Sequence, residues 1–287
     1  MSLTGSARIA GVMGWPVAQV FSPRLHGFWL AQTGIDGALV PLAVRPEDFA
    51  TVVRGLMKAG FKGSSVTVPH KEAAFALCHD CDLAARAAGA VNLLIFHASG
   101  RIEGCNTDAT GLAAALRETL GADCVRGKTA VLLGAGGAAR AAVVALHDLG
   151  AAEIRIVNRT RARAEQLAAA LAPQVAPKLV VHDEADWAGG ASGAVLAVNT
   201  TSAGMKGAPS LDLDLGALPA SAAVCDIVYN PLETPLLKKA RTAGLRTVDG
   251  LGMLMHQGVP AFEAFFGVVP KVTPALRAHL EEALRAR

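Results

Sequence analysis

The segment 129–160 constrains the fold of this 287-residue chain more than any other. It begins with an apolar run at 129–133, typical of a buried parallel strand, and continues through a glycine-rich turn at 134–139. The alanine-, valine- and leucine-rich run 140–149 predicts a helix, and 154–157 predicts a second strand. Strand, glycine turn, helix and strand in this order predict a βαβ unit of the dinucleotide-binding kind.

Each small residue of the turn has a physical reason to be there. Gly134 allows a tight turn out of the strand, and Gly136 lets a pyrophosphate approach the backbone. Ala139 lets the helix and the strand pack closely. Free N–H groups at the helix start would hold the pyrophosphate. The alternative is a glycine turn that binds no nucleotide, but the strands and helix around it favour a nucleotide site.

The end of the second strand indicates which nucleotide is bound. An NAD site usually has Asp or Glu there to accept a hydrogen bond from the ribose 2′-OH, whereas this chain has Asn158 and Arg159. A guanidinium can pair bidentately with a 2′-phosphate. Arg161 and Arg163 follow, and the alternative for these two is a solvated helix face. The sequence therefore predicts NADP rather than NAD.

Composition excludes several classes of protein. The chain is 52% hydrophobic and 18% charged, so it has ample material for a core. Since no run of about 18 apolar residues occurs and no signal peptide is recognised, we expect no membrane association. The net charge of +3 is small and the basic residues are scattered, so we expect no nucleic-acid partner.

The five cysteines form no disulfide framework. Cys78 and Cys81 have CxxC spacing, which leaves a metal or redox site as an alternative. No second pair follows at a usual spacing, and the pair falls within a predicted helix that begins near Glu72. We therefore expect no metal and a reduced, cytoplasmic protein.

The first hundred residues alternate strands and helices. Strands are predicted at 9–12, 38–44 and 65–68, and helices follow the first two of them. Ser22 is expected to cap the first helix, with Pro23 at its first position. A hairpin is predicted from a strand at 90–96 and a second strand from residue 101 onward, around a turn at 98–100. Strand predictions after the nucleotide unit are 179–181, 195–199, 223–228 and 246–248, followed by helices at 251–266 and 274–286.

Hydride transfer to or from a ring alcohol requires a group that manages the alcohol proton. Polar residues at strand and loop ends of the first unit are the candidates, and Lys71 with Asp108 is the best pair by residue type. The alternative is that both are solvated surface residues. The full set of candidates is Ser22, Ser65, Thr67, Lys71, Asn92 and Asp108.

With these motifs, the chain resembles the shikimate/quinate dehydrogenase family over nearly its whole length. The resemblance lies in several separate motifs: Gly14-Trp-Pro16 with 22–26, then 66–71, 89–92, 106–108, 134–140, 158–160, 199–204, 226–231 and 250–257. It implies two α/β domains with an interdomain cleft. An N-terminal substrate domain (1–107 plus 251–287) would flank a Rossmann-like NADP-binding domain (108–250). It also implies reversible NADP-linked reduction of 3-dehydroshikimate in the shikimate pathway of aromatic amino acid biosynthesis.

The same resemblance assigns roles to residues. Lys71 and Asp108 are expected to be catalytic. The expected substrate-binding residues are Ser22, Ser65, Thr67, Asn92, Tyr229 and Gln257. The expected cofactor-binding residues are Gly134, Ala135, Gly136, Gly137, Ala138, Asn158, Arg159, Thr160, Arg163, Thr200, Gly250 and Met253.

Three positions depart from the family pattern. The family has two serines flanking one residue in the substrate loop, and both donate to the shikimate carboxylate. Here these positions read Val20-Phe21-Ser22, so one donor is replaced by an apolar side chain. Ser65 stands where the family usually has Asn, and Leu93 where it usually has Thr. Losing one hydrogen bond to a charged group costs about 1.5–3 kcal/mol.

These departures leave three hypotheses. The chain is an ordinary shikimate dehydrogenase that tolerates Val20, or a paralogue that prefers quinate or another cyclic hydroxy acid. The third hypothesis is a non-catalytic NADP-binding regulator. A monomer or a homodimer is expected in each case.

Overall fold

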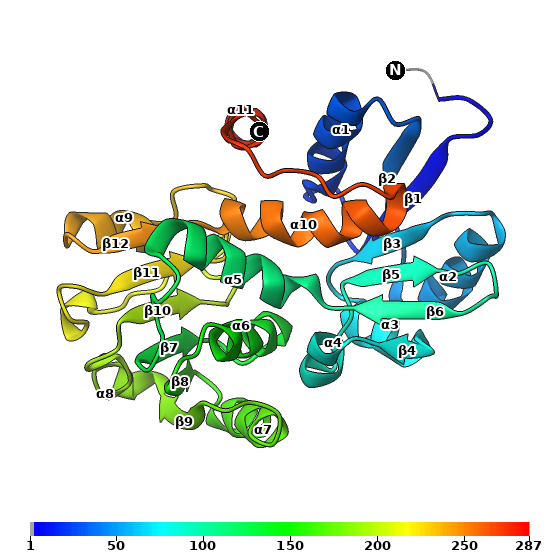
Figure 1. Cartoon of the computed structure of the whole chain (residues 1–287). Coiled ribbons are helices and arrows are strands. Elements are labelled where there is room, and N and C mark those ends of the chain that lie inside the picture. Colours follow the sequence, from blue (N-terminus) through cyan, green and yellow to red (C-terminus); the bar gives the residue numbers. More distant parts are fainter. Residues whose placement is uncertain (1–2, 287) are drawn as a thin grey trace. The chain divides into compact units, whose positions relative to one another are not determined.

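The computed structural model describes residues 3–286 and divides into two compact units (Figure 1). The first unit holds the chain up to Thr107 and again from Gln257 onward, and the second holds Asp108–His256. Each unit is an α/β structure built on its own sheet. Within residues 3–286, no helix is both long enough and apolar enough to cross a membrane.

The strands of the first unit form a mixed sheet in the order β2-β1-β3-β5-β6-β4. β1 lies parallel to both β2 and β3, whereas β3, β5 and β6 are successively antiparallel. The strands are β1 (Arg8–Gly14), β2 (Gly37–Ala43), β3 (Gly63–Val66), β4 (Asp80–Cys81), β5 (Leu93–Phe96) and β6 (Ile102–Cys105). Two of the predicted substrate-binding residues lie next to strand ends: Thr67 directly follows β3, and Asn92 directly precedes β5.

The helices of the first unit begin and end at recognisable signals. They are α1 (Ser22–Thr33), α2 (Phe49–Lys58) after a short 3-10 turn η1 (Pro46–Asp48), α3 (Lys71–Leu77), α4 (Leu83–Ala88) and α11 (Pro274–Arg285). α1 ends at Gly34, whose φ of 68° is left-handed and free of strain only for glycine. The prediction that Ser22 caps α1 was wrong: Phe21 is the N-cap, it makes no side-chain cap, and Ser22 is the first helical residue. The prediction considered residue types and could not fix the backbone position within the turn.

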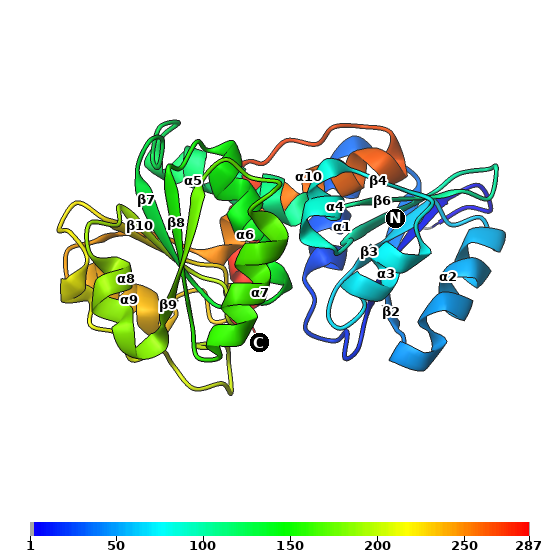
Figure 2. The same ribbon diagram turned by 90° about the horizontal axis from the view of Figure 1, so that it is seen from below.

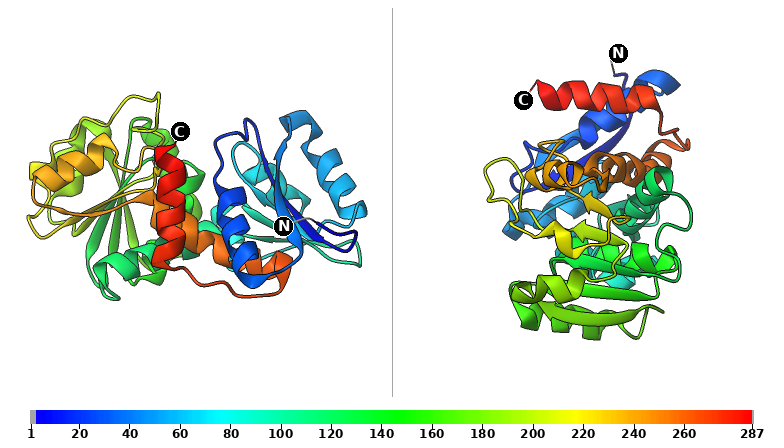
Figure 3. Two further views of the ribbon diagram at one scale, coloured as in Figure 1. Left: turned by 90° about the horizontal axis from the view of Figure 1, so that it is seen from above. Right: turned by 90° about the vertical axis from the view of Figure 1, so that its left-hand side faces the viewer.

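An aromatic cluster fills the core of the first unit. His26 and Trp29 of α1 meet the phenylalanines at the end of α10 (Gly250–Phe266), with ring centroids of His26 and Phe262 5.7 Å apart. α11 lies beside α1, where Phe28 contacts His279 (Figure 3). Burial of these rings joins the two ends of the chain into one core.

The second unit has a parallel sheet with the strand order β12-β11-β10-β7-β8-β9. Its strands are β7 (Thr129–Leu133), β8 (Glu153–Asn158), β9 (Lys178–Asp183), β10 (Leu196–Asn199), β11 (Ala223–Asp226) and β12 (Arg246–Val248). Read from β9, the order is 3-2-1-4-5-6, that of the doubly wound nucleotide-binding fold, with its switch point between β7 and β10. The predicted fold class, two α/β domains of which one is Rossmann-like, is confirmed.

Helices cover both faces of this sheet (Figure 2). α6 and α7 lie on one face and α8 and α9 on the other, as expected for parallel strands buried on both sides. Their bounds are α5 (Thr107–Leu120), α6 (Gly137–Asp148), α7 (Arg161–Leu171), α8 (Trp187–Ala191) and α9 (Pro235–Thr242), with 3-10 turns η2 (Glu184–Asp186) and η3 (Leu215–Ala217).

Candidate functional site

The turn after β7 requires glycine at its first position. Gly134 has a φ of 110°, and a Cβ atom there would lie 2.7 Å from the Thr200 hydroxyl oxygen. That hydroxyl donates a 2.6 Å hydrogen bond to the carbonyl oxygen of Leu133, and the Thr200 N–H donates to the same oxygen. Thr200 therefore supports the turn from behind, at the switch point of the sheet.

The start of α6 offers an anion-binding position. Gly136 is the N-cap and provides no side-chain cap, so the first N–H groups of α6, including those of Gly137 and Ala138, have no side chain across them. A Cβ atom at Gly136 would meet nothing within 4 Å, so the space beside it is open. These N–H groups and the helix dipole fit a pyrophosphate. The residues present therefore fit the phosphate part of a dinucleotide.

A pocket of about 270 Å³ lies at the ends of β7 and β8. It is lined by Leu133, Gly134, Val157, Asn158, Arg159, Glu184, Thr201, Ser202, Ala203, Ala208, Pro209 and Leu211. Asn158 is held in place by its side-chain amide, which donates to the carbonyl oxygen of Thr160 at 2.8 Å. The residues 201–211 contribute mainly small and apolar groups to one wall, which suits a flat ring.

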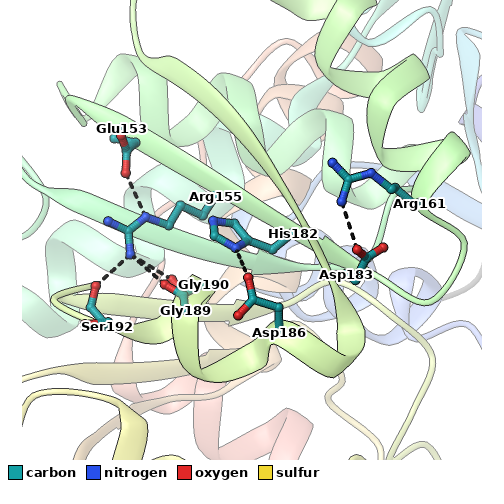
Figure 4. Close-up of polar contacts among 9 residues, drawn as sticks. All are labelled: Glu153, Arg155, Arg161, His182, Asp183, Asp186, Gly189, Gly190 and Ser192. Carbon is teal, nitrogen blue, oxygen red and sulfur yellow. Dashed lines mark hydrogen bonds and ion pairs between the residues drawn. The ribbon is translucent and has the colours of Figure 1, made fainter.

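The arginines after β8 differ in what they contact, and Figure 4 shows the pairing of Arg161 with Asp183. Arg161 is paired with Glu165 at 2.8 Å and with Asp183 at 2.9 Å, and these carboxylates raise its pKa. Within residues 3–286, the guanidinium of Arg159 has no ion-pair partner, and Arg159 lines the pocket. Arg163 is exposed on α7 and does not line the pocket. Of these three arginines, Arg159 is therefore the one that lines the pocket and could pair with a 2′-phosphate there.

The loop after β11 is organised by a buried carboxylate. Asp226 accepts hydrogen bonds from the Asn199 amide at 2.9 Å, the Thr234 hydroxyl at 2.6 Å and the Val228 N–H at 3.1 Å. Burial raises the pKa of Asp226, while these donors oppose the shift. The loop leads to Tyr229, which is half-buried.

Gly250 lets α10 approach this loop. A Cβ atom at Gly250 would lie 2.1 Å from the carbonyl oxygen of Ile227, so no other residue fits without movement of the backbone. Met253, one turn further along α10, is half-buried.

In the first unit, Asn92, Thr107 and Gln257 form one hydrogen-bonded set. The Asn92 amide donates to the Thr107 hydroxyl at 3.0 Å, and the Thr107 N–H donates to Asn92 Oδ1 at 2.8 Å. The Thr107 hydroxyl in turn donates to the carbonyl oxygen of Gln257 at 2.9 Å. Asn92 and Gln257 were predicted to bind substrate, but Thr107 was not singled out. Its place between Asn106 and Asp108 in the matched motif 106–108 was the only signal.

Lys71 is the first residue of α3, and its position depends on His70. His70 is 1% exposed, donates from Nε2 to the carbonyl oxygen of Val44 at 2.8 Å, and stacks on Phe49 with centroids 4.6 Å apart. The carbonyl oxygen of Lys71 accepts a hydrogen bond from the Val91 N–H at 2.9 Å.

Asp108 is the second residue of α5 and is 8% exposed. Lys71 belongs to the first unit and Asp108 to the second.

The other predicted substrate residues follow the pleat of β3. Ser65 and Thr67 are half-buried on one face, whereas Ser64 and Val66 are buried on the other. Ser22 is 9% exposed at the start of α1, and Val20 is half-buried before it.

The CxxC pair does not lie within a helix, and that prediction was wrong. α3 ends at Leu77, Cys78 follows it, and Cys81 belongs to β4, since His79 pairs with Ile102 of β6. Burial raises the pKa of the Cys78 thiol to about 12, so this thiol is protonated at neutral pH. No group of three metal-binding side chains occurs within the described residues. A raised pKa is the opposite of what a reactive thiolate requires, so Cys78 does not have the environment of a redox-active thiol.

The second unit is a dinucleotide-binding domain of the Rossmann type, with open space beside Gly136 at the start of α6 and with Arg159 lining the pocket at the end of β8. The profile of the shikimate dehydrogenase substrate-binding domain matches residues 12–94, and that of shikimate/quinate 5-dehydrogenase matches residues 116–184. Shikimate dehydrogenase (NADP(+)) of Paramagnetospirillum magneticum is 53% identical over 276 residues, covering 96% of this chain and 99% of the relative.

Solved structures agree with these matches. Shikimate 5-dehydrogenase from Listeria monocytogenes, in complex with shikimate and NAD, has a TM-score of 0.88 at 28% identity and covers 99% of this chain and 98% of that one. Quinate dehydrogenase from Corynebacterium glutamicum, in complex with NAD, has a TM-score of 0.88 at 29% identity, with 96% and 99% covered. The chain belongs to the shikimate/quinate dehydrogenase family, and the resemblance inferred from its motifs is confirmed.

Proposed function

We propose that this chain is an NADP-dependent shikimate dehydrogenase that transfers hydride reversibly between 3-dehydroshikimate and shikimate. The observation that carries the proposal is the hydrogen-bonded set of Asn92, Thr107 and Gln257 in the first unit. A regulator that only senses NADP has no need of this set, whereas an enzyme that orients a ring bearing several hydroxyls does. In this proposal the first unit binds substrate and the second binds NADP.

The bound nicotinamide supplies the hydride acceptor or donor. Lys71 holds the reacting hydroxyl oxygen and takes up or returns its proton, and Asp108 is its carboxylate partner. Asn92 and Gln257 orient the other ring hydroxyls, together with Thr67 and Tyr229. Arg159 receives the 2′-phosphate and thereby favours NADP over NAD.

The carboxylate of the substrate is the group for which this chain differs from its family pattern. Ser22 donates one hydrogen bond to it, and Val20 cannot donate a second. Quinate or another cyclic hydroxy acid therefore remains a second candidate substrate, because Val20 changes both the donors and the shape of this end of the site.

Steady-state reduction of NADP⁺, followed by the absorbance of the reduced cofactor, tests the proposal with shikimate and quinate in parallel and with NAD⁺ in place of NADP⁺. Turnover of shikimate with NADP⁺ supports the assignment. Turnover of quinate alone assigns the chain to a paralogue. Tight NADP⁺ binding without turnover of any ring acid would leave the regulator as the better reading.

We also propose that the enzyme acts in the cytoplasm as a monomer or a homodimer. Five free cysteines, whose thiols are protonated or buried, fit a reducing compartment. Sedimentation equilibrium of the purified chain distinguishes the two assembly states.

A further inference from the structure

The pocket at the end of β8 holds two opposite charges that do not pair with each other. Arg159 and Glu184 both line it, and within the described part of the chain neither side chain has an ion pair or a hydrogen bond. A cation and a carboxylate left apart in one pocket of about 270 Å³ fit a ligand that presents an anion to one and a hydrogen-bond donor to the other.

The carboxylates on either side of Glu184 are engaged in other contacts (Figure 4), whereas Glu184 lines the pocket. Asp183, on one side, is paired with Arg161 at 2.9 Å. Asp186, on the other side, accepts from His182 Nδ1 at 2.7 Å, and this contact lowers the pKa of Asp186. Each neighbouring carboxylate thus has its own cation or donor.

Arg155 holds the segment that follows. Its guanidinium donates to the carbonyl oxygens of Gly189, Gly190 and Ser192 at the end of α8, at 3.1, 3.2 and 2.6 Å (Figure 4). Glu153 pairs with the same guanidinium at 2.7 Å. The chain from β9 through α8 is therefore fixed to β8, and Glu184 has a defined position at the pocket.

The order of the strands relates Glu184 to a particular part of the nucleotide. β7, β8 and β9 are successive neighbours in the sheet, and their ends carry the phosphate position at Gly136, the 2′-phosphate position at Arg159 and then Glu184. The part of the nucleotide beyond its ribose is the adenine base. A carboxylate only accepts hydrogen bonds, and the donor on the adenine ring is its 6-amino group.

We propose that Glu184 reads the base of the cofactor by accepting a hydrogen bond from the adenine 6-amino group, while the ring lies against Pro209 and Leu211. This inference rests on the proposed function, because it takes the ligand to be NADP. It assigns to Glu184 a role in base selectivity that is separate from the choice between NADP and NAD made by Arg159.

Equilibrium binding of NADP⁺ and of its hypoxanthine analogue, deamino-NADP⁺, tests the proposal by calorimetry without any turnover. The analogue replaces the 6-amino donor with a 6-oxo acceptor, which would face the carboxylate. The wild-type chain is expected to bind NADP⁺ about ten-fold or more tightly than the analogue. Glu184→Gln is expected to bind the two about equally, because a carboxamide can accept from the amino group and donate to the oxo group.

Glu184→Ala and Glu233→Gln complete the set. Glu184→Ala is expected to weaken NADP⁺ binding and to lose the discrimination. Glu233→Gln, which changes an exposed carboxylate paired with Arg241 outside the pocket, is expected to behave as the wild type.

Four results would overturn the inference. Equal binding of the two dinucleotides by the wild type would overturn it alone, as would full discrimination by Glu184→Gln. Tighter NADP⁺ binding by Glu184→Gln with unchanged discrimination would mean that Glu184 faces the 2′-phosphate instead. Failure of the wild type to bind NADP⁺ at all would overturn the proposed cofactor and this inference together.

Discussion

Two hydrogen bonds join the Asn92 side chain to Thr107. Asn92 Nδ2 donates to Thr107 Oγ1 at 3.0 Å, and the Thr107 N–H donates to Asn92 Oδ1 at 2.8 Å. Both residues are 5% exposed, so water does not replace a lost partner. The pair fixes the rotation of the Asn92 amide. Asn92 is thereby presented in one orientation.

Thr107→Val removes the hydroxyl but keeps the shape of the side chain. We expect kcat/KM for shikimate to fall about ten-fold, because the Asn92 amide and the Gln257 carbonyl each lose a partner. Steady-state kinetics measure this effect, and NADP⁺ affinity should not change. Thr107→Ser keeps the hydroxyl and serves as the control; an equal loss in both variants would mean that packing, not hydrogen bonding, matters at this position.

Arg159→Gln should reverse the cofactor preference. We expect the Kd for NADP⁺ to rise by about ten- to a hundred-fold with little change for NAD⁺, because only NADP⁺ carries the 2′-phosphate. Fluorescence titration with each cofactor measures both constants. Arg161→Gln is the matched control, since its guanidinium is occupied by Glu165 and Asp183. A comparable loss in the control would contradict the assignment of the phosphate to Arg159.

His26 makes the stability of the first unit depend on pH. Complete burial lowers the pKa of His26 to about 3, and its Nδ1 has no partner within the described residues. The unfolded pKa is about 6.5, so unfolding takes up a proton below that pH. The stabilisation from a neutral His26 is fully present above pH 6.5. It declines by about 1.4 kcal/mol per pH unit between 6.5 and 3.

His26→Phe keeps a ring in the aromatic cluster and removes the titration. Urea unfolding at a series of pH values should give a shallower loss of the free energy of unfolding for this variant below pH 6.5. Identical slopes for the wild type and the variant would exclude His26 as the source of the acid sensitivity.

His70→Phe keeps the ring that stacks on Phe49 but leaves the buried carbonyl oxygen of Val44 without its donor. We expect a loss of about 1–3 kcal/mol in the free energy of unfolding. Because His70 is the N-cap of α3, kcat should fall as Lys71 shifts, with little change in the Kd for NADP⁺. Wild-type stability with wild-type kcat would show that the stacked ring alone holds α3.

Val20→Ser restores the second donor to the substrate carboxylate. We expect kcat/KM for shikimate to rise by about ten-fold, from one added hydrogen bond to a charged group. Val20→Thr is a matched variant, since it keeps a branched side chain and adds the hydroxyl. An unchanged kcat/KM in both variants would mean that Val20 does not decide the substrate.

The nucleotide unit was predictable because its signals are local. The turn at Gly134 needs a residue with positive φ, and the apolar runs around it correspond to β7, α6 and β8. The short elements were not predicted: β4 has two residues and α8 has five, too few to show a period. α9 was also missed, although Thr234 caps it and Pro235 begins it, because its eight residues are too few to show a clear helical period.

The functional residues that were missed depend on contacts between distant segments. Thr107 gains its importance from Gln257, 150 positions further along the chain. Glu184 follows β9 without any motif, and only the parallel sheet brings it to the pocket of Arg159. The sequence assigned the 2′-phosphate to Arg159 and left Arg161 with a solvated helix face as its alternative; the structure adds that Arg161 is paired with Glu165 and Asp183.

The division of the first unit between both ends of the chain has a consequence for how the protein is made. On the ribosome, the second unit is fully synthesised once His256 has been added, whereas the aromatic cluster around Trp29 still lacks Phe262 and its neighbours. The N-terminal hundred residues can bury the cluster around Phe49 from their own side chains, but the aromatic cluster must wait for the last thirty residues to emerge. A premature stop after His256 spares every residue of the nucleotide unit and removes the C-terminal part of the first unit.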